Sequence, residues 1–183
     1  MGTDSKAMQK IRSLCNLLHL KQDEVLAKAK LVLENYQQIV WADNQKMGNS
    51  TASLYEIRDK MPEEAILFLA GVAPTVSNVY FQEQILTLLE AEWLTELICT
   101  AMKYVEAFPV HGSIYYNILS DCYLSDAQYP DRCCIKATGL ERSVFYQRKK
   151  EATILFGVSL WGIMIPYWLK LYHINVNQQI CSV

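Results

Sequence analysis

The chain has 183 residues, of which 51% are hydrophobic and 20% are charged, and its formal net charge at pH 7 is −2. This composition excludes an intrinsically disordered chain and supplies enough apolar surface for the core of one domain, or of one and a half. The chain has seven glycines and five prolines, which leave long stretches without a helix breaker. We therefore expect an all-α fold and exclude an all-β sandwich, which needs a turn signal about every ten residues.

The first predicted helix covers residues 20–47. Its apolar residues Val25, Ala29, Val32 and Tyr36 recur at spacings of three and four and therefore fall on one stripe of a helix. The pattern lasts fewer than three heptads. We expect a helix that packs on other helices, with a coiled coil as the alternative.

Between residues 48 and 109 the sequence predicts three further helices. Residues 53–56 match a capping box, which would begin a short helix. Pro62 is expected to begin the next helix, which would end near Gly71. Residues 76–109 then show the longest apolar period, with five glutamates that fall largely between the apolar positions. This predicts one long amphipathic helix whose acidic face is either solvated or docks a basic partner.

Three short helices are expected in the C-terminal third, at residues 113–124, 130–138 and 141–156. Ser113 is a candidate cap of the first helix. Gly139 supplies the residue that tolerates a left-handed backbone in a tight turn between the last two. Three helices joined in this way are typical of a helix-turn-helix.

The last two of these helices carry a local excess of positive charge. Residues 132–150 contain six basic side chains and one acidic side chain, Glu141. A helix that enters DNA presents long hydrogen-bond donors to base edges and phosphates, and turns apolar residues towards its neighbouring helices. Leu140, Phe145 and Ala152 are candidates for the inner face. The candidate DNA-binding residues are Arg132, Lys136, Arg142, Ser143, Tyr146, Gln147, Arg148, Lys149 and Lys150.

The run LERSVFYQRKKEA, residues 140–152, resembles the recognition helix of sigma-factor region 4-like domains. It is most similar to the phage-encoded late-gene transcription activators of the RinA and ArpU type. Residues 115–119 and 154–162 extend the similarity on both sides, so the resemblance covers roughly residues 105–162. This family usually has an inward apolar residue where this chain has Lys149.

The resemblance implies a DNA-binding transcription regulator of phage or prophage origin that needs no cofactor. The implied partner is double-stranded DNA, while contact with RNA polymerase and self-association into a homo-oligomer stay open. The helix-turn-helix domain would cover residues 110–165, between a helical region of no assigned role at 1–109 and a tail at 166–183. The helix near 141–156 would be the recognition helix.

The uncharged stretch from Ala152 to Leu169 is just long enough to span a membrane. Gly157, Gly162 and Pro166 interrupt it. We therefore expect two shorter buried helices in place of a membrane span. Trp161 within this stretch is expected to be buried against the helix-turn-helix.

An enzyme and a metal site are not expected. The chain has no phosphate-binding, nucleophile-elbow or zinc-protease motif, and none of its three histidines has a second ligand at helical spacing. The cysteines show no paired spacing, which predicts free thiols and a cytoplasmic location: they are Cys15, Cys99, Cys122, Cys133, Cys134 and Cys181. The alternative function is a non-enzymatic helical protein whose acidic helix and apolar tail build an oligomer without binding DNA.

Overall fold

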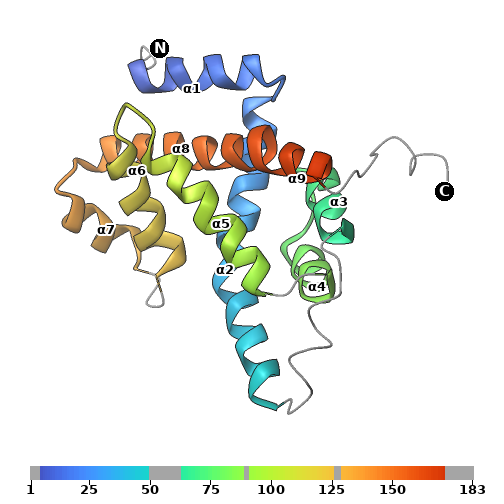
Figure 1. Ribbon diagram of the computed structural model, residues 1–183. Coiled ribbons are helices and arrows are strands. Elements are labelled where there is room, and N and C mark those ends of the chain that lie inside the picture. Colours follow the sequence, from blue (N-terminus) through green and yellow to red (C-terminus); the bar gives the residue numbers. More distant parts are fainter. Residues whose placement is uncertain (1–4, 50–62, 89–90, 126–128, 172–183) are drawn as a thin grey trace.

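The computed structural model describes residues 5–49, 63–88, 91–125 and 129–171, and their regular structure is entirely helical (Figure 1). The α-helices are α1 (Lys6–Leu17), α2 (Gln22–Asn49), α3 (Glu63–Gly71), α4 (Asn78–Leu88), α5 (Ala91–Glu106), α6 (Gly112–Leu119), α7 (Asp131–Thr138), α8 (Arg142–Gly157) and α9 (Ile165–Leu171). Two π-helical segments follow α6 and α8, namely η2 (Ser120–Leu124) and η3 (Val158–Met164). The described residues contain no strand, so the expected all-α fold is confirmed.

The helices of the N-terminal part match two of the predictions and add one helix. Helices α2 and α3 occupy the segments predicted at 20–47 and 62–71, and α2 packs on α8, α4 and η2 as a packed helix does. Helix α1 was not predicted. Its cap is Ser5, whose hydroxyl accepts a hydrogen bond from the backbone N–H of Met8 at 3.0 Å. The predicted capping box at 53–56 lies outside the described residues.

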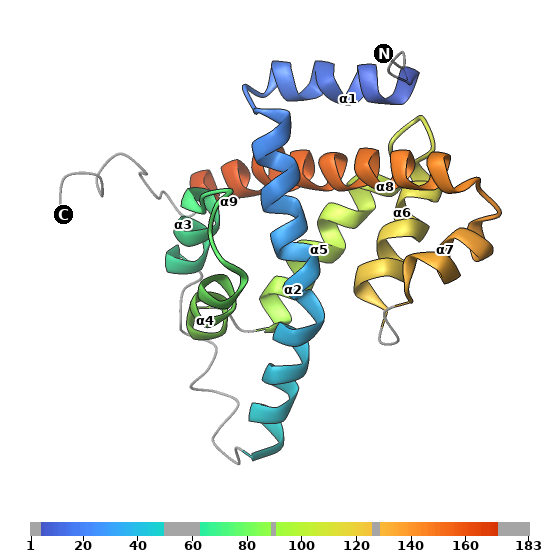
Figure 2. The same cartoon turned by 180° about the vertical axis from the view of Figure 1, so that it is seen from behind.

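The expectation of one long helix over residues 76–109 was wrong. The structure has two helices there, α4 and α5, and they point in different directions (Figures 1 and 2). Helix α4 buries Phe81 and Ile85 and packs on α2 and α3, whereas α5 buries Ile98 and Val105 and packs on α6, α8 and η3. The apolar residues of α4 and of α5 thus pack on different helices, and a single straight helix could not contact both sets.

The two short helices expected in the apolar tail were also wrong, because α8, η3 and α9 form one continuous helix of 30 residues, Arg142–Leu171. Pro166 has no N–H to donate within this helix, and the widened turns of η3 precede it, as is common where a helix absorbs such a defect. At Gly157, a Cβ would lie 2.5 Å from a methyl group of Val25, so this glycine lets α2 cross the helix closely (Figure 2).

One hydrophobic core takes side chains from all the α-helices except α7, on both sides of residue 110. The C-terminal helix lies at its centre, and every residue from Glu151 to Trp161 is buried. By length and composition this helix could also cross a membrane, and 67% of its most apolar window is buried against the rest of the protein. A second, smaller cluster joins α6, η2, α7 and the beginning of α8.

Trp161 is buried, as expected, but the expected packing partner was wrong. Its indole N–H donates a hydrogen bond to the backbone oxygen of Leu69 in α3 at 2.8 Å. The Lys28 ammonium of α2 lies 5.6 Å from the centre of its ring. Trp161 therefore joins the C-terminal helix to α2 and α3, whereas we expected it to pack on the helix-turn-helix.

Candidate nucleic-acid interface

Helices α6, α7 and the first turns of α8 form a three-helix unit around the smaller cluster (Figure 1). The buried members of this cluster are Ile118, Cys134 and Phe145, and the half-buried members around them are Ile114, Cys122, Ile135 and Leu140. The turn between α7 and α8 is three residues long. Gly139 ends α7 in the left-handed region with φ 64°, and its N–H bonds to the oxygen of Ile135 at 3.1 Å, as expected for a C-terminal glycine cap.

The first helix of this unit begins one residue earlier than predicted, and Ser113 does not cap it. Helix α6 starts at Gly112, and His111 is the cap residue, with φ 64° and no side-chain hydrogen bond to the helix. A Cβ at Gly112 would lie 2.2 Å from the backbone oxygen of Glu106. Close contact between the beginning of α6 and the end of α5 therefore sets the start of the helix, and Ser113 is an exposed residue inside it.

Seven of the nine candidate DNA-binding residues are exposed. Arg142, Ser143, Tyr146, Gln147 and Lys150 lie on α8, and Arg132 and Lys136 lie on α7. The five positions on α8 repeat at spacings of three and four, so they share one side of the helix. They extend over about 12 Å of helix axis at roughly 1.5 Å per residue, which is similar to the width of a B-DNA major groove, about 12 Å.

Two of the candidates, Arg148 and Lys149, point inwards instead. The Arg148 guanidinium donates to the Glu151 carboxylate at 2.7 Å, and the Lys149 ammonium donates to the Asp131 carboxylate at 2.6 Å. Their side chains are only 17% and 18% exposed. Asp131 and Glu151 lie immediately outside the basic segment 132–150, so a charge count of that segment misses both counter-ions.

Lys149 occupies the position where the family pattern has an inward apolar residue. Its ammonium lies 4.8 Å from the centre of the Tyr123 ring, and its ion pair connects α8 to the first turn of α7. Burial lowers the pKa of Lys149, but the hydrogen bond to Asp131 and the neighbouring groups outweigh burial and hold the pKa above its ordinary value. The lysine thus stays charged and holds the two helices together.

Glu151 is a buried carboxylate that sequence reasoning missed. It is fully buried and accepts hydrogen bonds from Tyr115 Oη at 2.7 Å, from Arg148 Nη1 at 2.7 Å and from Gln147 Nε2 at 3.3 Å. The Ser5 hydroxyl donates a fourth. Burial raises the pKa of Glu151, but these donors, Ser5 first, outweigh it and hold the pKa below its ordinary value. Glu151 therefore ties α1 and α6 to α8 as an ionised group.

The described cysteines are free thiols, as expected, and Cys181 lies outside the described residues. The closest pair lies inside the three-helix unit, where the sulfur atoms of Cys122 and Cys134 are 3.3 Å apart. Burial and then the hydrogen bond to Cys134 raise the pKa of the Cys122 thiol to about 12. At neutral pH the Cys122 thiol is therefore uncharged, as suits its place in a small core.

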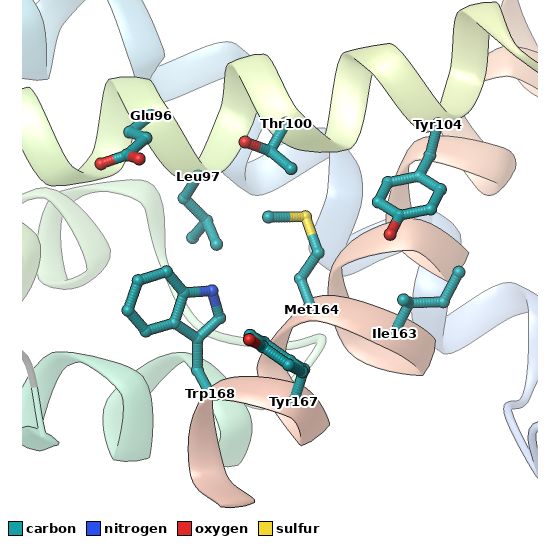
Figure 3. A pocket seen from close by; sticks show the side chains of 8 residues that line it. All are labelled: Glu96, Leu97, Thr100, Tyr104, Ile163, Met164, Tyr167 and Trp168. Carbon is teal, nitrogen blue, oxygen red and sulfur yellow. The ribbon is translucent and has the colours of Figure 1, made fainter. Parts of the chain in front are cut away.

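A pocket of about 250 Å³ opens between α5 and the end of the C-terminal helix (Figure 3). It is separate from the exposed side of α8. Its lining residues, four from α5 and four from η3 and α9, are Glu96, Leu97, Thr100, Tyr104, Ile163, Met164, Tyr167 and Trp168.

No protein-family model matches the chain, and neither a curated protein nor a solved structure does. The resemblance of residues 105–162 to sigma-factor region 4-like domains therefore stays a prediction. The features that could carry a function are the three-helix unit with its exposed residues and the pocket.

Proposed function

We propose that the protein is a non-enzymatic, cytoplasmic DNA-binding transcription regulator of phage or prophage origin. The observation that supports this best is the first half of α8. Five exposed polar side chains lie on one of its sides, and one of them, Gln147, also donates a hydrogen bond to Glu151 at 3.3 Å. The small cluster and two ion pairs hold the opposite side. A helix that is held from behind and exposes long donors in front can enter a major groove.

In this proposal the exposed residues divide into two kinds. Arg142, Tyr146 and Gln147 lie in the first two turns of α8, where side chains reach base edges, with Ser143 beside them. The Arg142 guanidinium lies 5.8 Å from the centre of the Tyr146 ring, an arrangement that orients a long side chain before it binds. Lys150 and the two basic residues of α7, Arg132 and Lys136, would contact phosphates.

The sequence predicted that Arg148 and Lys149 contact phosphates. In the structure both side chains instead form ion pairs within the protein. Their partners Glu151 and Asp131 neutralise them, which leaves four basic side chains and Glu141 on the exposed surface of residues 132–150. This lowers the net positive charge that can face DNA. We expect weaker nonspecific binding and a smaller salt dependence than the sequence alone suggests.

The test is a titration of the full-length chain against random and prophage-promoter duplexes at two salt concentrations. Arg142→Ala or Gln147→Ala should cost about 1–3 kcal/mol at a cognate site and relax specificity. Lys150→Ala should weaken binding to every duplex and reduce the salt slope by about one. The matched control is Lys103→Ala, which removes an exposed basic side chain from α5 and should change neither property.

Absence of binding to either duplex at low salt would overturn the proposal. The alternative, a helical oligomerisation protein, predicts instead a concentration-dependent molar mass in size-exclusion chromatography with light scattering. Self-association and contact with RNA polymerase are compatible with DNA binding, so the duplex titration decides between the two functions.

A further inference from the structure

The pocket between α5 and the C-terminal helix is the second place where side chains of distinctive chemistry converge. Residues 96–104 of α5 form one wall, and residues 163–168 form the other (Figure 3). Its nearest lining residue on the C-terminal helix, Ile163, lies about 20 Å along the helix axis from Lys150, at roughly 1.5 Å per residue. A ligand in this pocket would therefore not compete with DNA for the exposed side of α8.

The walls combine aromatic rings with a single carboxylate. Tyr104, Tyr167 and Trp168 supply the rings, and Tyr104 and Tyr167 are 47% and 61% exposed, so part of each ring faces the opening. Glu96 is the one charged residue of the lining, and it lies at the same end of the pocket as Trp168 (Figure 3). No lysine or arginine is among these lining residues, and Glu96 is exposed to solvent.

We propose that this pocket binds a small organic cation with an apolar body, such as a quaternary or aryl ammonium compound. Aromatic faces attract cations through the ring quadrupole, and a carboxylate adds a full opposite charge. Leu97, Ile163 and Met164 provide apolar contacts for the rest of the ligand. The volume is below the roughly 300–1,000 Å³ of pockets for drug-sized ligands, so a small ligand fits best.

Other ligand classes fit these walls less well. An anion would face the Glu96 carboxylate without any basic group to balance it. A neutral apolar ligand would fill the space but would leave the carboxylate unused at its end. A second copy of the chain would have to place a basic side chain there, and that occupancy would show as a change of molar mass with concentration.

The experiment compares two probes of equal shape, 3-hydroxyphenyl-trimethylammonium and its neutral isostere 3-tert-butylphenol, with the full-length chain. The indole N–H signal of Trp168, assigned with Trp168→Phe, reports occupancy by NMR, and calorimetry gives the affinity. We expect the cation to bind about tenfold more tightly than the isostere. Glu96→Gln should weaken the cation about fivefold or more and leave the isostere within about twofold.

The matched control is Glu106→Gln, which removes an exposed carboxylate of α5 outside the pocket and should change neither affinity. If Glu96→Gln does not fold, Tyr104→Leu replaces a half-exposed ring and should weaken the cation selectively. Equal affinity for the two probes would overturn the proposal. So would a Trp168 signal that stays unmoved at millimolar cation, or one that moves only with protein concentration. The assay contains no DNA, so its outcome is independent of the proposed function.

Discussion

Replacing Glu151 by glutamine should lower the free energy of unfolding by about 3 kcal/mol. The substitution keeps the shape of the side chain and removes its charge, so the Arg148 guanidinium loses the partner that it contacts at 2.7 Å. Removing one member of a buried ion pair costs about 3–5 kcal/mol. The lower end of this range applies because the Arg148 side chain is 17% exposed and regains part of its hydration.

Thermal unfolding at neutral pH measures this loss. For a chain of this length each kcal/mol lowers the midpoint by about 2–4 °C, so Glu151→Gln should lower it by about 6–12 °C. The loss should also depend on pH. Because the folded-state pKa of Glu151 lies below its ordinary value of 4.5, the stability from ionisation is present above that value. It is lost as the pH falls through the folded-state pKa, so the difference between the two proteins should shrink in acid.

The control is Glu24→Gln, which removes an exposed ion pair with the same three-residue spacing. Glu24 accepts from Lys21 at 2.9 Å, and both side chains are well solvated. Exposed pairs contribute little to stability, so the midpoint should stay unchanged. An equally small effect of both substitutions would refute the role of Glu151 as a buried tie between helices. A loss of stability that does not vary with pH would refute its ionisation.

Three further predictions test the packing of individual side chains. Lys149→Ala should lower the free energy of unfolding by about 2 kcal/mol because it leaves Asp131 without its partner. Lys150→Ala should change that free energy by no more than about 0.5 kcal/mol. Urea unfolding measures both variants, and equal effects would contradict the inward position of Lys149. Iodoacetamide should label the exposed Cys99 quickly and Cys122 slowly, with a Cys122 rate that rises as the pH approaches about 12, and mass spectrometry follows each site. Trp161→Ala should cost about 3–5 kcal/mol, and a loss below about 1 kcal/mol would show that the ring is not part of the core.

Helix ends that depend on local chemistry could be predicted from the sequence. Gly139 ends α7 with φ 64° and Pro130 precedes α7, because these two residues act through their own backbone geometry. Helix α1 was also within reach, since Ser5 precedes apolar residues at helical spacing.

Features that depend on distant neighbours could not be predicted in this way. The division of residues 76–109 into α4 and α5 follows from which helices each part packs on, and no local signal encodes that choice. The pairing of Lys149 with Asp131 joins residues 18 positions apart. The pairing of Arg148 with Glu151 is different, because its spacing of three residues was readable from the sequence.

The continuous burial of the C-terminal helix from Glu151 to Trp161 limits how this protein can be divided or recombined. Every residue from Glu151 to Trp161 is covered, partly by α1 and α2, which come from the other end of the chain. A fragment cut at residue 110 would carry this apolar helix uncovered and should aggregate. The N-terminal helices would in turn lose the C-terminal helix on which they pack. Exchange of the C-terminal part with that of another protein should therefore fail unless the helices that surround it are transferred together with it.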